Sequence, residues 1–183
     1  KDLRAMEATA VSAGYLPKLL SAVSAVNDQQ KSLLFKKIDS YFDGQLEGKT
    51  IALWGLAFKP GTDDMREAPS RDLMEALWQR GAKVQAFDPH GMEATQEIYG
   101  VRNDLLLCGT KEAALQGADI LAICTEWKPF WSPDFALIKD SLKQPVIFDG
   151  RNLYDPARLQ DRGIQYFGMG RSNQVAPSAT ACD

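Results

Sequence analysis

Charged and aromatic side chains gather at four places where an apolar run of the sequence ends. In chain order they are Phe58, Lys59, Asp63, Asp64 and Arg66; then Asp88 and His90; then Glu126 and Trp127; then Asp149 and Arg151. Arginine binds phosphate through a bidentate fork, and lysine binds it as a point charge. Lys59 and Arg151 therefore suggest a clamp on a diphosphate, although solvated loop cations fit the same spacing equally well. Phe58 and Trp127 have the ring chemistry to stack on a base, and packing in the interior is their commoner use.

The apolar runs before these residues predict strands, and the segments between them predict helices. Ser70 and Ser132 are good helix N-caps, and Gly81 is a good helix stop. Alternating strands and helices indicate an α/β fold, a Rossmann-like doubly wound parallel sheet whose ligands bind at the carboxyl ends of the strands. The four groups of side chains are then expected to meet in one crevice. The predicted strands are KTIALWG, KVQAFDP, ADILAIC, PVIFDG and IQYFG.

The turn after the first predicted strand departs from the dinucleotide-binding pattern. That pattern is G-x-G-x-x-G, with a helix starting at once so that its N-terminus meets the pyrophosphate. Here only Gly55 and Gly61 are present, and the helix waits until Ser70. We therefore predict a Rossmann relative that does not bind NAD at this turn. Asp88 lies where a ribose-binding acid would fall, although Asp-Pro is also a common way to open a turn.

Residues 1–47 predict helix only. Asp2–Ala13 is rich in helix formers, and a helix of about 26 residues follows from Pro17 with apolar residues at helical spacing. The apolar stripe on so long a helix suits packing against another chain, and an ordinary helix bundle fits the periodicity as well. Because the chain opens on lysine and on helix formers without a cap, we expect a piece of a longer protein. The remaining divisions are a domain over 48–171 and a disordered tail over 172–183.

Composition excludes several classes of function. The chain has 183 residues and a net charge of −3, so no basic field favours nucleic acid. No apolar run reaches the roughly 18 residues that span a bilayer, so we expect no membrane segment. The three cysteines, Cys108, Cys124 and Cys182, form no CxxC pair, which argues against a disulfide framework and against a metal site. A reducing, cytoplasmic compartment is expected.

Several motifs together resemble the UDP-glucose/GDP-mannose dehydrogenase family of nucleotide-sugar dehydrogenases. They are GLAFKPGTDDMREAPS, FDPH, TEW, FDGRN, and the opening KDLRA followed by AVNDQQK. The resemblance implies the end of a central helical dimerisation region followed by the domain that holds the UDP part of the substrate. It also implies a homodimer through the central helix, UDP-glucose as the bound sugar nucleotide, and NAD as a cofactor held mainly by another domain. GDP-mannose or UDP-N-acetylmannosamine as substrate, and a non-catalytic oligomerisation module, are the alternatives.

The resemblance also assigns roles to individual residues. The family oxidises the C6 alcohol of the sugar twice, with two NAD, through a thiohemiacetal and a thioester on one cysteine. That cysteine would fall just before the first residue of this sequence, so no cysteine here matches it, and we expect the chain alone to be inactive. The implied roles are a catalytic aspartate in the hydrolytic step, Asp2; contacts to the substrate, Phe58, Lys59 and Arg151; and contacts to the cofactor, Lys1 and Arg66.

Overall fold

A computed structural model describes residues 2–171, without the side chains of residues 2 and 4. Its centre is a six-stranded sheet in the order β3-β2-β1-β4-β5-β6, in which every neighbouring pair is parallel. The predicted α/β, Rossmann-like doubly wound sheet is therefore confirmed. One strand, β3, was not among the five predicted. The strands are β1 Thr50–Trp54, β2 Lys83–Phe87, β3 Leu105–Leu107, β4 Ile120–Ile123, β5 Val146–Asp149 and β6 Gln165–Gly168.

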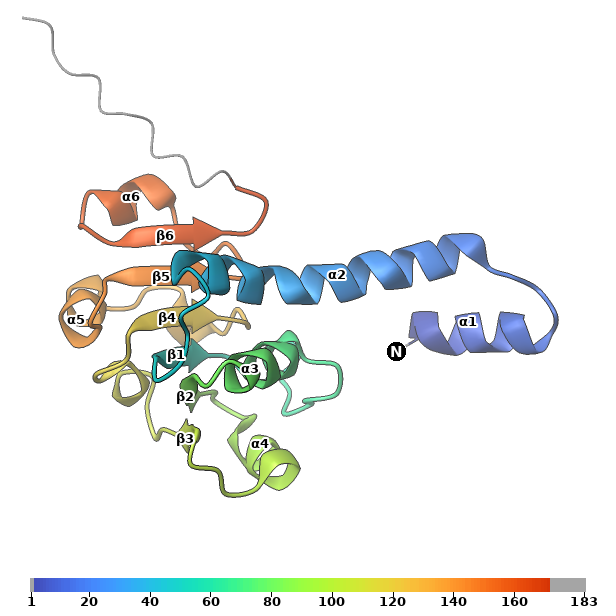
Figure 1. Cartoon of the computed structure of the whole chain (residues 1–183), viewed down its shortest axis with the longest axis horizontal. Coiled ribbons are helices and arrows are strands. Elements are labelled where there is room, and N and C mark those ends of the chain that lie inside the picture. Colours follow the sequence, from blue (N-terminus) through green and yellow to red (C-terminus); the bar gives the residue numbers. More distant parts are fainter. Residues whose placement is uncertain (1, 172–183) are drawn as a thin grey trace, which may run out of the picture.

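Helices cover both faces of this sheet, and a long helix precedes it as predicted. Figure 1 shows α2 projecting well beyond the sheet, with α1 folded back alongside it. The hydroxyl groups of Ser21 and Ser24 on α2 both donate to the carboxylate of Glu7 on α1, at 2.5 and 3.1 Å. The helices are α1 Asp2–Ser12, α2 Lys18–Tyr41, α3 Pro69–Gln79, α4 Met92–Tyr99, α5 Phe135–Ser141 and α6 Pro156–Gln160, with short 3₁₀ helices η1 Ala113–Leu115 and η2 Lys128–Phe130.

Both predicted N-caps were wrong. Helix α3 begins at Pro69, and the hydroxyl of Ser70 is buried and donates to the carbonyl oxygen of Leu56 at 2.5 Å. Helix α5 is capped by Asp134, whose carboxylate accepts from two backbone N–H groups of the first turn, so Ser132 lies outside the helix. Neither serine therefore caps its helix: Asp134 satisfies the start of α5, and α3 begins after Ala68 without a side-chain cap.

The sheet separates two apolar cores. One core packs α2, α3 and α4 against residues such as Ile51, Leu53 and Phe148. The other packs η1, η2, α5 and α6 against Trp54, Ile123 and neighbouring side chains. Parallel strands covered on both faces read as continuous apolar runs, and this is why the strand segments were visible in the sequence.

The end of α2 is part of the first core. Leu34 and Ile38 of the helix are buried there, together with Phe42 and Leu46 just beyond it. The described core therefore continues across the predicted boundary at residue 47, and the division into regions stays a prediction. The predicted tail, 172–183, lies outside the described residues.

Strand β1 pairs with β2 on one side and with β4 on the other, because the chain runs outward to β2 and β3 and then crosses back to β4. Such a reversal in strand order opens a crevice beyond the carboxyl ends of β1 and β4. At this point Gly55 has a φ of 87°, and a Cβ added to it would lie 2.6 Å from the Cβ and the backbone nitrogen of Thr125. Glycine is therefore required by both the backbone conformation and the close approach of the two strand ends.

Candidate functional site

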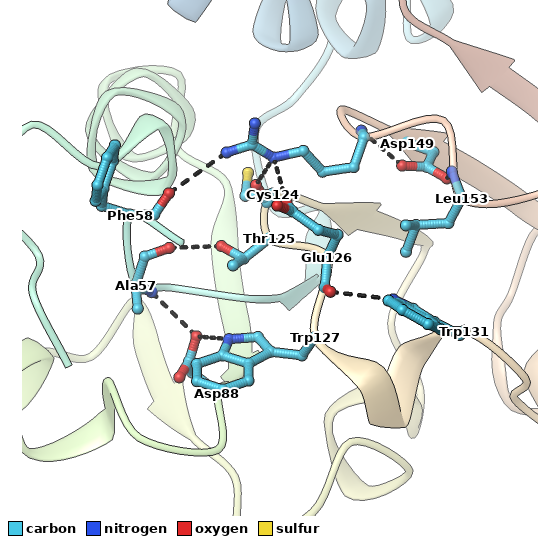
Figure 2. A network of polar contacts seen from close by, with 11 residues as sticks. Ala57, Phe58, Asp88, Cys124, Thr125, Glu126, Trp127, Trp131, Asp149 and Leu153 are labelled. Atoms are coloured by element: carbon cyan, nitrogen blue, oxygen red, sulfur yellow. Dashed lines mark hydrogen bonds and ion pairs between the residues drawn. The ribbon is translucent and has the colours of Figure 1, made fainter. Parts of the chain in front are cut away.

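Arg151 links the carboxyl ends of three strands. It follows β5, its Nε donates to the carbonyl oxygen of Cys124 after β4 at 2.7 Å, and its Nη2 reaches the carbonyl oxygen of Phe58 after β1 at 3.5 Å. The carboxylate of Glu126 lies 3.1 Å from the same Nε, off the direction of its single N–H bond, which is aimed at Cys124. Figure 2 shows these strand ends facing one another across the site.

The backbone of Arg151 is held by Asp149, the last residue of β5. The Asp149 carboxylate is buried and accepts from the backbone N–H groups of Arg151 and Leu153 and from the hydroxyl of Tyr166, at 2.7 to 2.9 Å. Burial raises the pKa of Asp149, and these hydrogen bonds partly oppose that rise. The turn that carries Arg151 is therefore fixed from inside the sheet.

The loop after β1 is fixed by partners on other elements. The backbone N–H groups of Leu56 and Ala57 donate to the carboxylate of Asp88 at 2.6 and 3.0 Å. The carbonyl oxygen of Leu56 accepts from Ser70 on α3, and that of Ala57 accepts from Thr125 at 2.5 Å. Because buried backbone groups need partners, this complete set explains how an irregular loop can run through the interior. Its ordered exit carries Phe58 to the surface.

Asp88 directly follows β2, where a dinucleotide-binding fold has its ribose-binding acid. Its carboxylate accepts from five groups within the chain: the N–H groups of Leu56 and Ala57, those of His90 and Gly91, and the indole N–H of Trp127 at 2.9 Å. A carboxylate offers about four lone-pair sites. These internal donors saturate Asp88, which is buried, so the ribose role considered for it is not supported.

A cleft of about 520 Å³ lies between α2 and the loop after β1. Of the residues predicted from the sequence to form a site, Phe58, Arg66 and Arg151 line it together. Lys59 is exposed and does not line the cleft, although its Nζ lies 5.8 Å from the centroid of the Phe58 ring. The cleft also includes Leu3, Ser24, Asn27, Asp28, Lys31, Asp64, Glu67 and Pro69.

The α2 residues of this cleft were missed by the sequence analysis. Asn27, Asp28 and Lys31 lie on a helix that the periodicity assigned to packing, and nothing in their spacing pointed to a site. Only the fold brings α2 against the strand ends, through the buried end of the helix. The cleft is therefore built by both predicted regions of the chain.

Charges of both signs meet in this cleft. Arg66 forms a bidentate ion pair with Asp64, at 2.7 and 2.9 Å, which raises the pKa of Arg66 and leaves its side chain 70% exposed. Lys31 lies 3.9 Å from Glu67 and 3.8 Å from Asp72. With three cations and three anions among the lining residues, the cleft has no net positive charge, so an anionic ligand would depend on particular cations and not on a positive field.

Two residues that the resemblance assigned to the site, Lys1 and Asp2, are the first two of the chain. Lys1 lies outside the described residues, and for Asp2 the structure describes the backbone at the start of α1. Their neighbour Leu3 lines the cleft. The roles of Lys1 and Asp2 stay predictions.

Neither described cysteine has the surroundings of a nucleophile. Cys124 is buried after β4, and burial raises the pKa of its thiol to about 12. Burial also raises the pKa of Cys108. Since the thiolate is the reactive form, both are structural thiols. Among the residues that the structure describes, no group of three or more histidine, cysteine or acidic side chains could hold a metal ion.

The sheet order and the crevice at β1 and β4 define a Rossmann-like nucleotide-binding domain. Within that class, residues 52–156 match the model of the "UDP-glucose/GDP-mannose dehydrogenase family, UDP binding domain". The chain belongs to this family, as the motifs of its strand-end loops predicted.

Individual relatives agree with this assignment. The chain is 48% identical over 174 residues to a UDP-glucose 6-dehydrogenase of Pseudomonas aeruginosa, covering 93% of this chain and 38% of that protein. It is 37% identical over 171 residues to the UDP-glucose 6-dehydrogenase TuaD of Bacillus subtilis, covering 93% and 36%. A solved UDP-glucose dehydrogenase from Pyrobaculum islandicum superposes with a TM-score of 0.75 at 27% identity, over 91% of this chain and 35% of that one. The chain thus spans little more than a third of the length of these relatives.

Over the described residues, no helix has the length and apolar character needed to cross a bilayer. The long helix α2 carries lysines and other polar side chains along its whole length.

Proposed function

We propose that this chain binds the UDP part of UDP-glucose within an NAD-dependent UDP-glucose 6-dehydrogenase, which oxidises UDP-glucose to UDP-glucuronate. The family assignment and the relatives named above support this proposal. Because the chain spans 38% of the Pseudomonas aeruginosa relative, the reaction, the substrate and the partners of the whole protein are part of the proposal.

The observation that carries the proposal is the way Arg151 is held. Its Nε end is anchored by Cys124, while Nη1 donates to no acceptor among the described residues. A guanidinium fixed at one end and open at the other can form two parallel hydrogen bonds to a phosphate with little loss of side-chain entropy. The diphosphate of UDP-glucose is the expected acceptor.

Phe58 is the better candidate for stacking on the uracil base. Its ring is 44% exposed beside the cleft, and the ring of Trp127 is buried with its N–H bonded to Asp88. Lys59 follows Phe58 and can add charge to the diphosphate from outside the cleft. Phe58, Lys59 and Arg151 remain the proposed substrate contacts.

NAD does not fit the turn after β1 in this domain. The backbone N–H groups that such a turn would direct to a pyrophosphate are bonded to Asp88. We therefore assign NAD mainly to another domain of the whole enzyme, with Lys1 and Arg66 as contacts to it and Asp2 as a catalytic residue of the hydrolytic step. The chain alone should then not oxidise UDP-glucose.

The homodimer is proposed through the central helix α2. Its first half exposes Leu19, Val23 and Val26, and Leu16 just before it is 74% exposed. Apolar side chains at this spacing form one face of a helix that a second copy could cover. A cytoplasmic location is also part of the proposal, supported by the free thiols of Cys108 and Cys124.

Calorimetric titration of the 183-residue chain with UDP, UDP-glucose, GDP and NAD tests the proposal. We expect UDP and UDP-glucose to bind, with GDP and NAD silent. Charge reversal by Arg151→Glu should weaken UDP at least about tenfold, and Lys59→Glu should weaken it less. Lys83→Glu, an exposed lysine on β2, is the matched control.

Three outcomes would contradict the proposal. Binding of NAD without UDP would make the domain a cofactor site. Stronger binding of GDP would favour the GDP-mannose branch of the family. Equal UDP affinity in the Arg151→Glu and Lys83→Glu variants would favour a module used for oligomerisation alone.

A further inference from the structure

The Asp88 carboxylate accepts five hydrogen bonds, and only two of them are needed to form its own turn. Two of its five donors come from its own turn, two from the loop after β1, and one from the loop after β4. We propose that Asp88 is a positioning residue: its carboxylate occupies the place of a bound phosphate on the β1 turn and so presets the substrate-binding loop. This inference rests on the proposed binding of UDP, which it deepens.

The turn after β1 has the geometry of an anion-binding site, and the anion in it is the carboxylate of Asp88 from the same chain. Consecutive backbone N–H groups that point to one place form a concave anion-binding nest. The N–H groups of Leu56 and Ala57 both point to the same oxygen, Oδ2 of Asp88. A Cβ added to Gly91 would lie 3.2 Å from the Ala57 nitrogen and 3.3 Å from the Asp88 carboxyl carbon, so the carboxylate lies in tight contact with both turns. A phosphate from outside therefore has neither the room nor the donors.

The consequence for the substrate loop follows from the chain order. Once the N–H groups of Leu56 and Ala57 are fixed, the peptide that leads into Phe58 has little freedom. The carbonyl oxygen of Ala57 is held by Thr125, and the N–H of Phe58 donates to the carbonyl oxygen of Asp64 at 2.9 Å. Asp88 thus orients Phe58 without itself lining the cleft.

The same carboxylate couples this loop to the one that anchors Arg151. The indole N–H of Trp127 donates to Oδ2, the oxygen that also binds the β1 turn. Trp127 is three residues beyond Cys124, whose carbonyl oxygen holds the Nε of Arg151. Figure 2 shows Asp88 below Ala57 with the Trp127 indole against it. Two of the three proposed substrate contacts, Phe58 and Arg151, are therefore positioned around one buried carboxylate.

The test compares the same aspartate-to-asparagine change at two positions, one at the carboxyl ends of the strands and one at their amino ends. Asp88→Asn places an amide N–H group against backbone donors. Asp119→Asn is the control, because Asp119 is also buried and also accepts from a backbone N–H, that of Thr50 on β1 at 2.8 Å, but at the far end of the strand. Each variant is titrated with UDP, and the exchange of its backbone amide hydrogens is followed by mass spectrometry.

We expect Asp88→Asn to weaken UDP about tenfold and to speed exchange over residues 55–60 by at least about as much. Asp119→Asn should leave UDP affinity within about twofold, with faster exchange only near Thr50. The proposal is overturned if Asp88→Asn leaves both readouts unchanged, or if Asp119→Asn loses as much UDP affinity, because a general loss of stability would then explain the effect.

A second variant covers the case in which Asp88→Asn does not fold. Trp127→Phe removes one donor from Oδ2 and keeps the ring in place, so it should speed exchange at Leu56 and Ala57 and weaken UDP about threefold. Unchanged exchange at these two amides would overturn the proposal. If the unaltered chain does not bind UDP, the proposed function fails, and the exchange data alone decide whether Asp88 holds the loop.

Discussion

Replacing Gly55 by alanine tests how closely the carboxyl ends of β1 and β4 approach each other. Gly55 has a φ of 87°, and the added Cβ would lie 2.6 Å from both the Cβ and the backbone nitrogen of Thr125. Contacts this short cannot be relieved by rotating a side chain, because one of the atoms is the backbone nitrogen of Thr125, two residues beyond β4. The two strand ends would have to separate.

The expected loss of stability has two parts. The left-handed backbone conformation costs about 1–2 kcal/mol for a residue with a Cβ. Overpacking at the β1–β4 contact adds about 1–3 kcal/mol. The lower entropy of the unfolded alanine chain offsets less than about 1 kcal/mol of this. The net loss is about 1–5 kcal/mol, which lowers Tm by roughly 2–20 °C for a chain of this size.

Gly48→Ala is the matched control. Gly48 also has a positive φ, of 73°, but a Cβ there would meet nothing within 4 Å. Urea unfolding of both variants should show that Gly55→Ala loses about 1–3 kcal/mol more than Gly48→Ala. UDP affinity should fall only in the Gly55 variant, because Phe58 and Arg151 depend on the spacing of these strand ends. Equal losses of stability in the two variants would refute the predicted clash.

Three further predictions follow from single residues. Because burial raises the pKa of Cys124 to about 12, iodoacetamide at mildly alkaline pH should modify it only after unfolding, and mass spectrometry showing native labelling would contradict this. Burial and a hydrogen bond to Glu75 raise the pKa of Tyr99 from 10.0 to about 12. The folded chain then holds this proton more tightly than the unfolded chain, so the stabilisation is present below pH 10 and is lost as pH rises through 12. In urea unfolding across this range, Tyr99→Phe should lack that part of the loss, and an identical pH profile would contradict the assignment. Asp134→Ala should cost about 1 kcal/mol by removing the α5 cap, with Ser132→Ala near zero in the same chemical-unfolding assay, and the reverse order would restore Ser132 as the cap.

The fold was largely predictable because its strands are buried on both faces. Ile120–Ile123 and Val146–Asp149 are fully buried, so the first appears in the sequence as an uninterrupted apolar run and the second as an apolar run up to its last residue. Strand β3 was missed for the opposite reason. It has three residues, lies at the edge of the sheet, and exposes Leu106. Three leucines carry no periodicity that separates a strand from a helix turn.

The site was less predictable than the fold because its contacts join distant parts of the chain. The sequence indicated that Phe58 and Arg151 lie at strand ends, and the structure places both in one cleft. It also indicated Asp88 at the end of the second strand. The inward turn of that carboxylate depends on donors 31, 32 and 39 residues away, which local spacing does not reveal. Lys31 lines the cleft only because the end of α2 packs against the sheet, and the sequence does not reveal this contact either.

These contacts explain why an arginine, and not a glycine-rich turn, is the central anion-binding group proposed for this domain. A Rossmann sheet can hold a phosphate with backbone N–H groups at the first turn. Here those N–H groups are hydrogen-bonded to Asp88, so the turn has no free donors to offer a ligand. A nucleotide diphosphate must then find its donors on side chains, and Arg151 is the one fixed at the meeting point of three strand ends. Binding should accordingly weaken with salt and depend on bidentate geometry, so that Arg151→Lys, which keeps the charge, should still lose affinity.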